Sequence, residues 1–186
     1  LRLDPRDGCG EQIDCLGFAR PRLGRIFWYQ QQFDSALAVF ESLSPAGWFP
    51  EHALVLGNLG RPKEGLELLS SQRQNADIAS VQALLLAQLG RATEALTRIQ
   101  TVRSGRVRSH FHHAQFNIAC AYARLGQARE AVEALRATAD NGLPNYPLFR
   151  DDPNLQSLKG NPEYEQLLGR LKTDWERRRL LVSPQN

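Results

Sequence analysis

Apolar and polar positions alternate along this chain with the period of an α-helix in several separate stretches. In one of them, Ile118, Tyr122 and Leu125 recur at spacings of four and three residues. This spacing places them on one face of a helix, because a helix makes one turn in about 3.6 residues. Gly126 follows directly, and a second helical pattern begins just after it. The pattern therefore predicts pairs of helices joined by short turns.

The same eleven-residue phrase occurs four times. It reads FWYQQQFDSAL at residues 27–37, LGNLGRPKEGL at 56–66, LAQLGRATEAL at 86–96 and YARLGQAREAV at 122–132. Successive copies begin 29, 30 and 36 residues apart, and Gln31 stands in the first copy where the others have glycine. Repeats with periods in this range predict stacked helical units that share one core.

Two positions of the phrase suggest why it recurs. The fifth position is glycine in three copies, and we expect it to end the first helix in the left-handed conformation that glycine adopts without steric penalty. The tenth position is small in every copy, and we expect two helices to cross closely there. A larger side chain would push them apart. The small residues are Ala36, Gly65, Ala95 and Ala131.

The first unit contains the residues of a known pattern in order: Leu23, Gly24, Phe27, Ala36, Phe40 and Pro45. Residues 16–144, which hold all four units, resemble the tetratricopeptide repeat, whose pattern places L-G-x2-Y ahead of A-x3-F and a closing proline. The resemblance implies an all-α fold, a right-handed superhelix of about four helical hairpins followed by C-terminal capping helices. It also implies a non-catalytic protein-binding module.

Residues 145–180 depart from the repeat and are expected to form the capping helices. Asp152 and Asn161 each precede a proline, which is a helix-start signal. This region resembles the C-terminal end of tetratricopeptide arrays in bacterial signalling proteins, and the resemblance implies a fused partner domain. Residues 181–186 are expected to be a tail.

Residues 1–15 are expected to be a lead-in to the array. The opening LRLDP is interpreted as a remnant of a preceding repeat. The chain begins with Leu1 and contains no methionine, so we expect it to be a piece of a longer protein.

The composition favours binding over catalysis. No apolar run approaches the length of about 20 residues that spans a bilayer, and neither a G-x-S-x-G elbow nor a phosphate-binding loop is present. We therefore expect no enzyme activity, no cofactor and no small-molecule substrate. The net charge of +3 is concentrated in residues 103–108 and 170–179. The arginines of the first patch leave a nucleic-acid accessory role open.

Histidines and cysteines are the remaining candidates for chemistry. His110, His112 and His113 precede Cys120, but structural zinc needs four ligands at spacings that this cluster lacks. We expect no metal site. Cys9 and Cys15 either pair or remain free thiols. With only three cysteines, a reducing, cytoplasmic location is favoured.

The run Phe27-Trp28-Tyr29 is the best candidate for a binding surface. Adjacent helical residues differ by about 100° in direction, so the three rings cannot all face the core. Trp28 therefore either faces a groove or packs against a lost upstream repeat. In tetratricopeptide arrays the first helix of each unit lines the concave surface. The resemblance then places these residues at the groove: Arg25, Trp28, Tyr29, Asn58, Leu84, Gln88, His113, Phe116 and Arg124.

The resulting hypothesis is a module that binds a peptide or protein segment in that groove. A regulatory or self-association domain of a bacterial signalling protein is the first alternative, and the nucleic-acid accessory is the second. Leu54 and Leu84 occupy places that are polar in the family's chaperone-binding members. We therefore expect no recognition of a chaperone C-terminus. The sequence leaves the partner's identity and the oligomeric state open.

Overall fold

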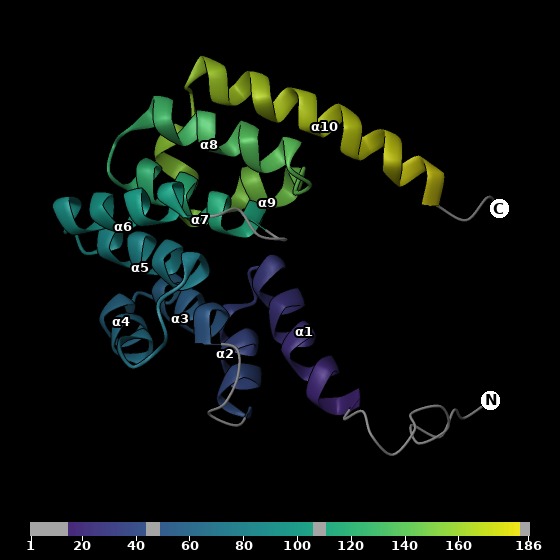
Figure 1. Cartoon of the computed structure of the whole chain (residues 1–186). Coiled ribbons are helices and arrows are strands. Elements are labelled where there is room, and N and C mark those ends of the chain that lie inside the picture. The colour runs from purple at the N-terminus through teal and green to yellow at the C-terminus, as the bar shows by residue number, and fades with distance from the viewer. Residues whose placement is uncertain (1–14, 44–48, 106–110, 183–186) are drawn as a thin grey trace, which may run out of the picture.

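The computed structural model describes residues 15–43, 49–105 and 111–182, and within these ranges the regular secondary structure is entirely helical (Figure 1). This confirms the all-α prediction. The elements are α1 (Cys15–Tyr29), α2 (Phe33–Glu41), α3 (Phe49–Asn58), α4 (Pro62–Ser70), α5 (Ala76–Gln88), α6 (Ala92–Ser104), α7 (Phe111–Arg124), α8 (Ala128–Asp140), α9 (Tyr146–Asp151), the 3-10 helix η1 (Pro153–Leu158) and α10 (Pro162–Val182).

Eight of these helices form four hairpins: α1–α2, α3–α4, α5–α6 and α7–α8. The first helices α3, α5 and α7 pack side by side, and each second helix from α2 to α6 contacts the hairpin that follows it. Figure 1 shows the resulting stack, with α10 crossing α8 and running on beyond it. Stacking is needed because a single hairpin cannot bury its own apolar face.

Each hairpin turn is closed by the same hydrogen bond. The N–H of the residue after the turn donates to the carbonyl oxygen of the residue five positions earlier, over 2.8–2.9 Å. That acceptor is the first residue of each repeated phrase. The residue before that donor has a positive φ, as expected when a helix ends in the left-handed conformation. These residues are Gln31, Gly60, Gly90 and Gly126, with φ of 59°, 77°, 71° and 75°. The expected role of the glycines is confirmed.

A Gln31→Gly variant is expected to be more stable than the wild type by roughly 0.5–1 kcal/mol, because Gln31 bears the steric cost of a left-handed residue that glycine avoids. The midpoint of urea unfolding measures the change. Gln30→Gly is the matched control: it removes the same side chain at a neighbouring exposed position and is expected to give no gain. Equal effects of the two substitutions would contradict the argument.

The small residue in the tenth position of each phrase lies where two helices touch. Ala36, Ala95 and Ala131 are fully buried, and Gly65 is buried in α4. A Cβ atom on Gly65 would lie 2.9 Å from the carbonyl oxygen of Ala53 in the partner helix. The predicted close crossing of the helices is therefore confirmed.

The C-terminal elements begin where the sequence predicted. The Asn161 side chain accepts hydrogen bonds from the N–H groups of Glu163 and Tyr164 at the start of α10 (3.0 and 3.1 Å). The Tyr164 hydroxyl donates to the carbonyl oxygen of Phe149 in α9 (2.6 Å), which joins α10 to the rest of the C-terminal segment. η1 packs against α7, and this placement matters for the site. No helix in the described ranges combines the length and hydrophobicity needed to cross a membrane.

Candidate functional site

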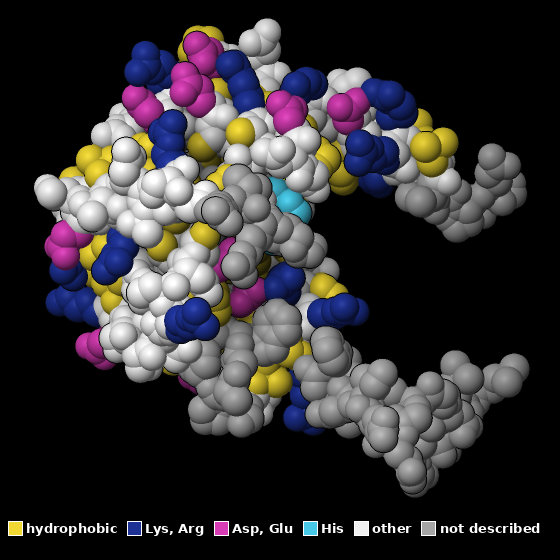
Figure 2. All heavy atoms as spheres, in the orientation of Figure 1, with side chains coloured by type: hydrophobic (Ala, Val, Ile, Leu, Met, Phe, Trp, Pro, Cys, Tyr) yellow, Lys and Arg dark blue, Asp and Glu magenta, His cyan; other side chains and the backbone are white. Residues whose placement is uncertain are grey.

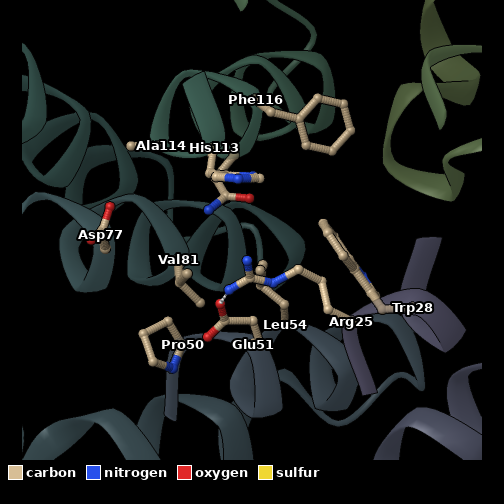
Figure 3. Close-up of a pocket in the computed structure, with 11 residues that line it drawn as sticks. Arg25, Trp28, Pro50, Glu51, Leu54, Asp77, Val81, His113, Ala114 and Phe116 are labelled. Atoms are coloured by element: carbon tan, nitrogen blue, oxygen red, sulfur yellow. Dashed lines mark hydrogen bonds and ion pairs between the residues drawn. The ribbon is translucent and has the colours of Figure 1, made fainter. Parts of the chain in front are cut away.

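A pocket of about 430 Å³ lies where the first helices of all four hairpins meet (Figure 3). It is called the pocket below. Its wall comes from α1, α3, α5 and α7, so every repeat contributes to it. The lining residues are Arg25, Trp28, Pro50, Glu51, Leu54, Asp77, Val81, His113, Ala114, Phe116 and Asn117.

The wall of the pocket is largely apolar. Trp28 and Phe116 lie on one side and Asp77 and Pro50 on the other, with Val81 and Leu54 between them (Figure 3). The Trp28 ring contacts the Tyr29 ring at 4.9 Å between centroids, and Phe116 stacks on Phe149 at 5.6 Å. These contacts fix both aromatic side chains in position.

Polar side chains in the pocket tie α1 to the rest of the array. Arg25 of α1 forms an ion pair with Glu51 of α3, and Figure 3 shows this pair in the middle of the pocket. The Tyr29 hydroxyl lies 3.4 Å from Nδ1 of His113 in α7, and burial raises the pKa of Tyr29. Asp77 is exposed in the first turn of α5. The position of α1, and with it the shape of the pocket, depends on these contacts.

The structure brings together only part of the predicted groove. Arg25, Trp28, His113 and Phe116 line the pocket, and Tyr29 lies beside it through its contact with His113. The Trp28 indole forms part of the pocket wall, with 7% of its surface exposed, and both interpretations of this residue remain predictions.

Other predicted groove residues lie beneath the chain's own C-terminal segment. Gln88 Nε2 donates to Asn154 Oδ1 of η1 (2.9 Å), and Asn154 Nδ2 donates to Asn58 Oδ1 (3.2 Å). Leu84 is buried in the core, with 3% of its surface exposed. Arg124 is exposed but does not line the pocket. Asn58 and Gln88 are half-buried and bind η1 through Asn154, so they do not join the pocket residues in one open groove.

Asp152 holds the start of η1 in place. Its carboxylate accepts hydrogen bonds from the backbone N–H and the side-chain amide of Asn154 (2.8 and 3.0 Å). The Sγ atom of Cys120 lies 4.0 Å from Oδ1 of the same carboxylate. Burial raises the pKa of Asp152 to about 6 although those hydrogen bonds lower it, and burial raises the pKa of Cys120 well above its usual range. Both groups are enclosed by the protein.

The remaining candidates from the sequence are histidines, cysteines and the arginines of residues 103–108. The rings of His112 and His113 lie 4.4 Å apart, while His110 falls outside the described residues. Within those residues, no three His, Cys, Asp or Glu side chains are placed to hold a metal ion. Arg103 donates to the Tyr122 hydroxyl over 3.4 Å. Arg106, Arg108 and Cys9 also lie outside the described residues.

Leu54 and six other lining residues were not among the predicted groove residues. Helical spacing would have found the two charged residues in this set. Glu51 lies one turn before Leu54 on α3, and Asp77 lies one turn before Val81 on α5. Continuing the row of predicted groove residues towards the start of each helix, at intervals of three or four residues, therefore reaches both carboxylates. The other missed residues are Pro50, Val81, Ala114 and Asn117.

Comparison with known proteins identifies the repeat. Residues 113–141, which span most of α7 and all of α8, match the family model of the tetratricopeptide repeat. A chloroplastic protein of Arabidopsis thaliana is 27% identical over 88 residues, a match that covers 47% of this chain and 26% of that protein. A solved structure titled "MamA AMB-1 P212121" aligns with a TM-score of 0.42 at 15% identity, covering 92% of this chain and 100% of that one.

Proposed function

We propose that this chain, a tetratricopeptide-repeat protein with a matching repeat at residues 113–141, is a non-catalytic module that binds a segment of a protein partner in the pocket. The observation that supports this most directly is the convergence of α1, α3, α5 and α7 on one partly apolar recess. Stacked repeats form such a surface between the first helices of successive units.

The residues of the pocket suit an anchoring side chain from a partner. Trp28, Leu54 and Phe116 provide apolar surface, and aromatic pockets of this kind commonly contribute most of the energy of an interface. Glu51 and Asp77 provide carboxylates beside that surface, where they would orient a bound chain through hydrogen bonds and ion pairs. The expected partner segment is short, because η1 covers the neighbouring surface around Asn58 and Gln88.

A Trp28→Ala variant is expected to bind its ligand peptides at least about tenfold more weakly than the wild type, equivalent to roughly 1.4 kcal/mol, because it removes one wall of the pocket. The ligands are peptides selected against the wild-type chain from a random display library. Their affinities are then measured by fluorescence anisotropy with labelled peptide.

Arg124→Ala is the matched control, since Arg124 was predicted in the groove but does not line the pocket. It should leave affinity unchanged, and circular dichroism should show that both variants remain folded. Val81→Trp fills the pocket from its floor and gives a second test that leaves α1 unaltered. If the selected peptides bound Trp28→Ala and Val81→Trp as tightly as the wild type, the pocket would not be the binding site.

A further inference from the structure

The last two turns of α10 extend beyond the body of the protein. Trp175 is the last side chain of α10 that packs against the core, where its ring meets that of Tyr146 at 5.8 Å. The helix continues to Val182, which adds about 10 Å at 1.5 Å per residue. Figure 1 shows this end of α10 projecting away from the helical stack.

Two leucines lie on this projecting end, which is called the α10 tip (residues 176–181) below. Leu180 and Leu181 are 78% and 81% exposed, the largest fractions among the large hydrophobic side chains of the described residues. A single exposed leucine is ordinary on a protein surface, but two adjacent ones on an unsupported helix end are unfavourable in water. Packing against another surface would stabilise both the leucines and the helix.

The α10 tip is also strongly basic. Three arginines, Arg177, Arg178 and Arg179, directly precede the leucines, and Glu176 is the one acid among them. Figure 2 shows hydrophobic and basic side chains next to one another near the end of α10. A surface that covers this tip therefore needs apolar side chains next to carboxylates.

The pocket has this combination. Its apolar wall contains Leu54, Val81 and Phe116. Of its two carboxylates, Asp77 is exposed and Glu51 is paired with Arg25. In Figure 2, acidic, basic and histidine side chains lie in the recess between α10 and α1. Leucines would fit against the apolar wall while an arginine of the tip meets the exposed Asp77.

We infer that the occupant of the pocket is the α10 tip of a second copy of this chain. The inference rests on the proposed function, since it names the partner of the same pocket. A copy does not fill its own pocket in this fold: α10 contacts α8 and α9, and its C-terminal end lies apart from α1. Each molecule presents one tip and one pocket, so two arrangements satisfy the contact: copies joined head to tail, or a closed dimer in which each tip enters the other copy's pocket.

The wild-type chain is expected to self-associate, and a Leu180→Ser, Leu181→Ser double variant is expected to lose this association. Sedimentation velocity measures this, with the wild type gaining mass between low micromolar and submillimolar concentrations and the variant remaining monomeric. Both side chains are exposed, so the substitutions leave the core intact. Leu96→Ser is the matched control, because Leu96 is another exposed leucine (37%) on α6, outside the pocket lining. It should associate like the wild type.

Variants of the pocket test the other half of the contact. Val81→Trp should also be monomeric, and Asp77→Arg, which replaces an exposed side chain, should weaken association if Val81→Trp unfolds. A mixture of the tip variant with the Val81→Trp variant retains one intact tip and one intact pocket. It should form a dimer and nothing larger.

A wild-type chain that stays monomeric throughout, or a tip variant that associates like the wild type, would overturn the inference. Either result would leave the proposed function standing as long as library peptides still required Trp28 for binding. If library peptides instead bound the Trp28→Ala variant as tightly as the wild type, the proposed function itself would be rejected.

Discussion

An Asp152→Asn variant is expected to be more stable than the wild type at neutral pH by up to about 3 kcal/mol, and to differ little from it near pH 4. Asp152 is 4% exposed, and burial raises its pKa from 3.8 to about 6. The folded protein therefore retains a proton that the unfolded chain has already released. Stability is lost as the pH rises from about 4 to about 6, because ionising the buried carboxyl favours the unfolded chain.

The asparagine oxygen can accept the same hydrogen bonds from Asn154 without the cost of a buried charge. The free energy of urea unfolding, measured for both proteins at several pH values, gives the difference directly. Taking this difference cancels the contributions of the exposed carboxyl groups that both proteins share.

Asp151→Asn is the matched control one residue away. The Arg150 side chain holds the pKa of Asp151 below its usual value, so this carboxylate favours folding above its unfolded pKa. Its replacement should lower stability slightly at neutral pH, the opposite sign from Asp152. If the free energies of unfolding of the wild type and the Asp152→Asn variant changed in parallel with pH, Asp152 would ionise in the folded protein as it does in the unfolded chain.

A Gly65→Ala variant is expected to lower the free energy of unfolding by roughly 1–3 kcal/mol, although alanine is the better helix former. The added methyl group would lie 2.9 Å from the Ala53 carbonyl oxygen and 3.0 Å from the Leu85 side chain. The carbonyl belongs to the backbone of α3, so the clash is relieved only by moving the two helices of the hairpin apart. That movement also disturbs the neighbouring α5.

The same substitution at Gly169 provides the control. Gly169 lies inside α10, is exposed, and a Cβ atom there would meet nothing within 4 Å. Gly169→Ala should therefore raise stability by up to about 1 kcal/mol through helix propensity alone. Thermal unfolding followed by circular dichroism compares the two variants. A stabilised Gly65→Ala protein would show that the α3–α4 crossing tolerates a larger residue.

The sequence by itself determined the repeating unit. The left-handed turn residues, the small residues at the helix crossings and the helix starts at Asp152 and Asn161 all follow from interactions within a few residues or between the two helices of one hairpin. Such interactions depend on local conformation and on residue size, and both can be read along the chain. Even Gln31, the exception to the glycine pattern, adopts the conformation that its position in the phrase requires.

Only the tertiary structure decided which part of the concave surface stays open. Asn58, Leu84 and Gln88 occur at the same helical spacing as the pocket residues, yet Leu84 is in the core and the two amides bind Asn154, which is 96 and 66 residues away from them in sequence. Nothing local in the chain specifies that η1 folds back onto α7. That placement depends on burial of apolar surface and on hydrogen bonds between side-chain amides from different hairpins. Both become possible only once the hairpins have stacked.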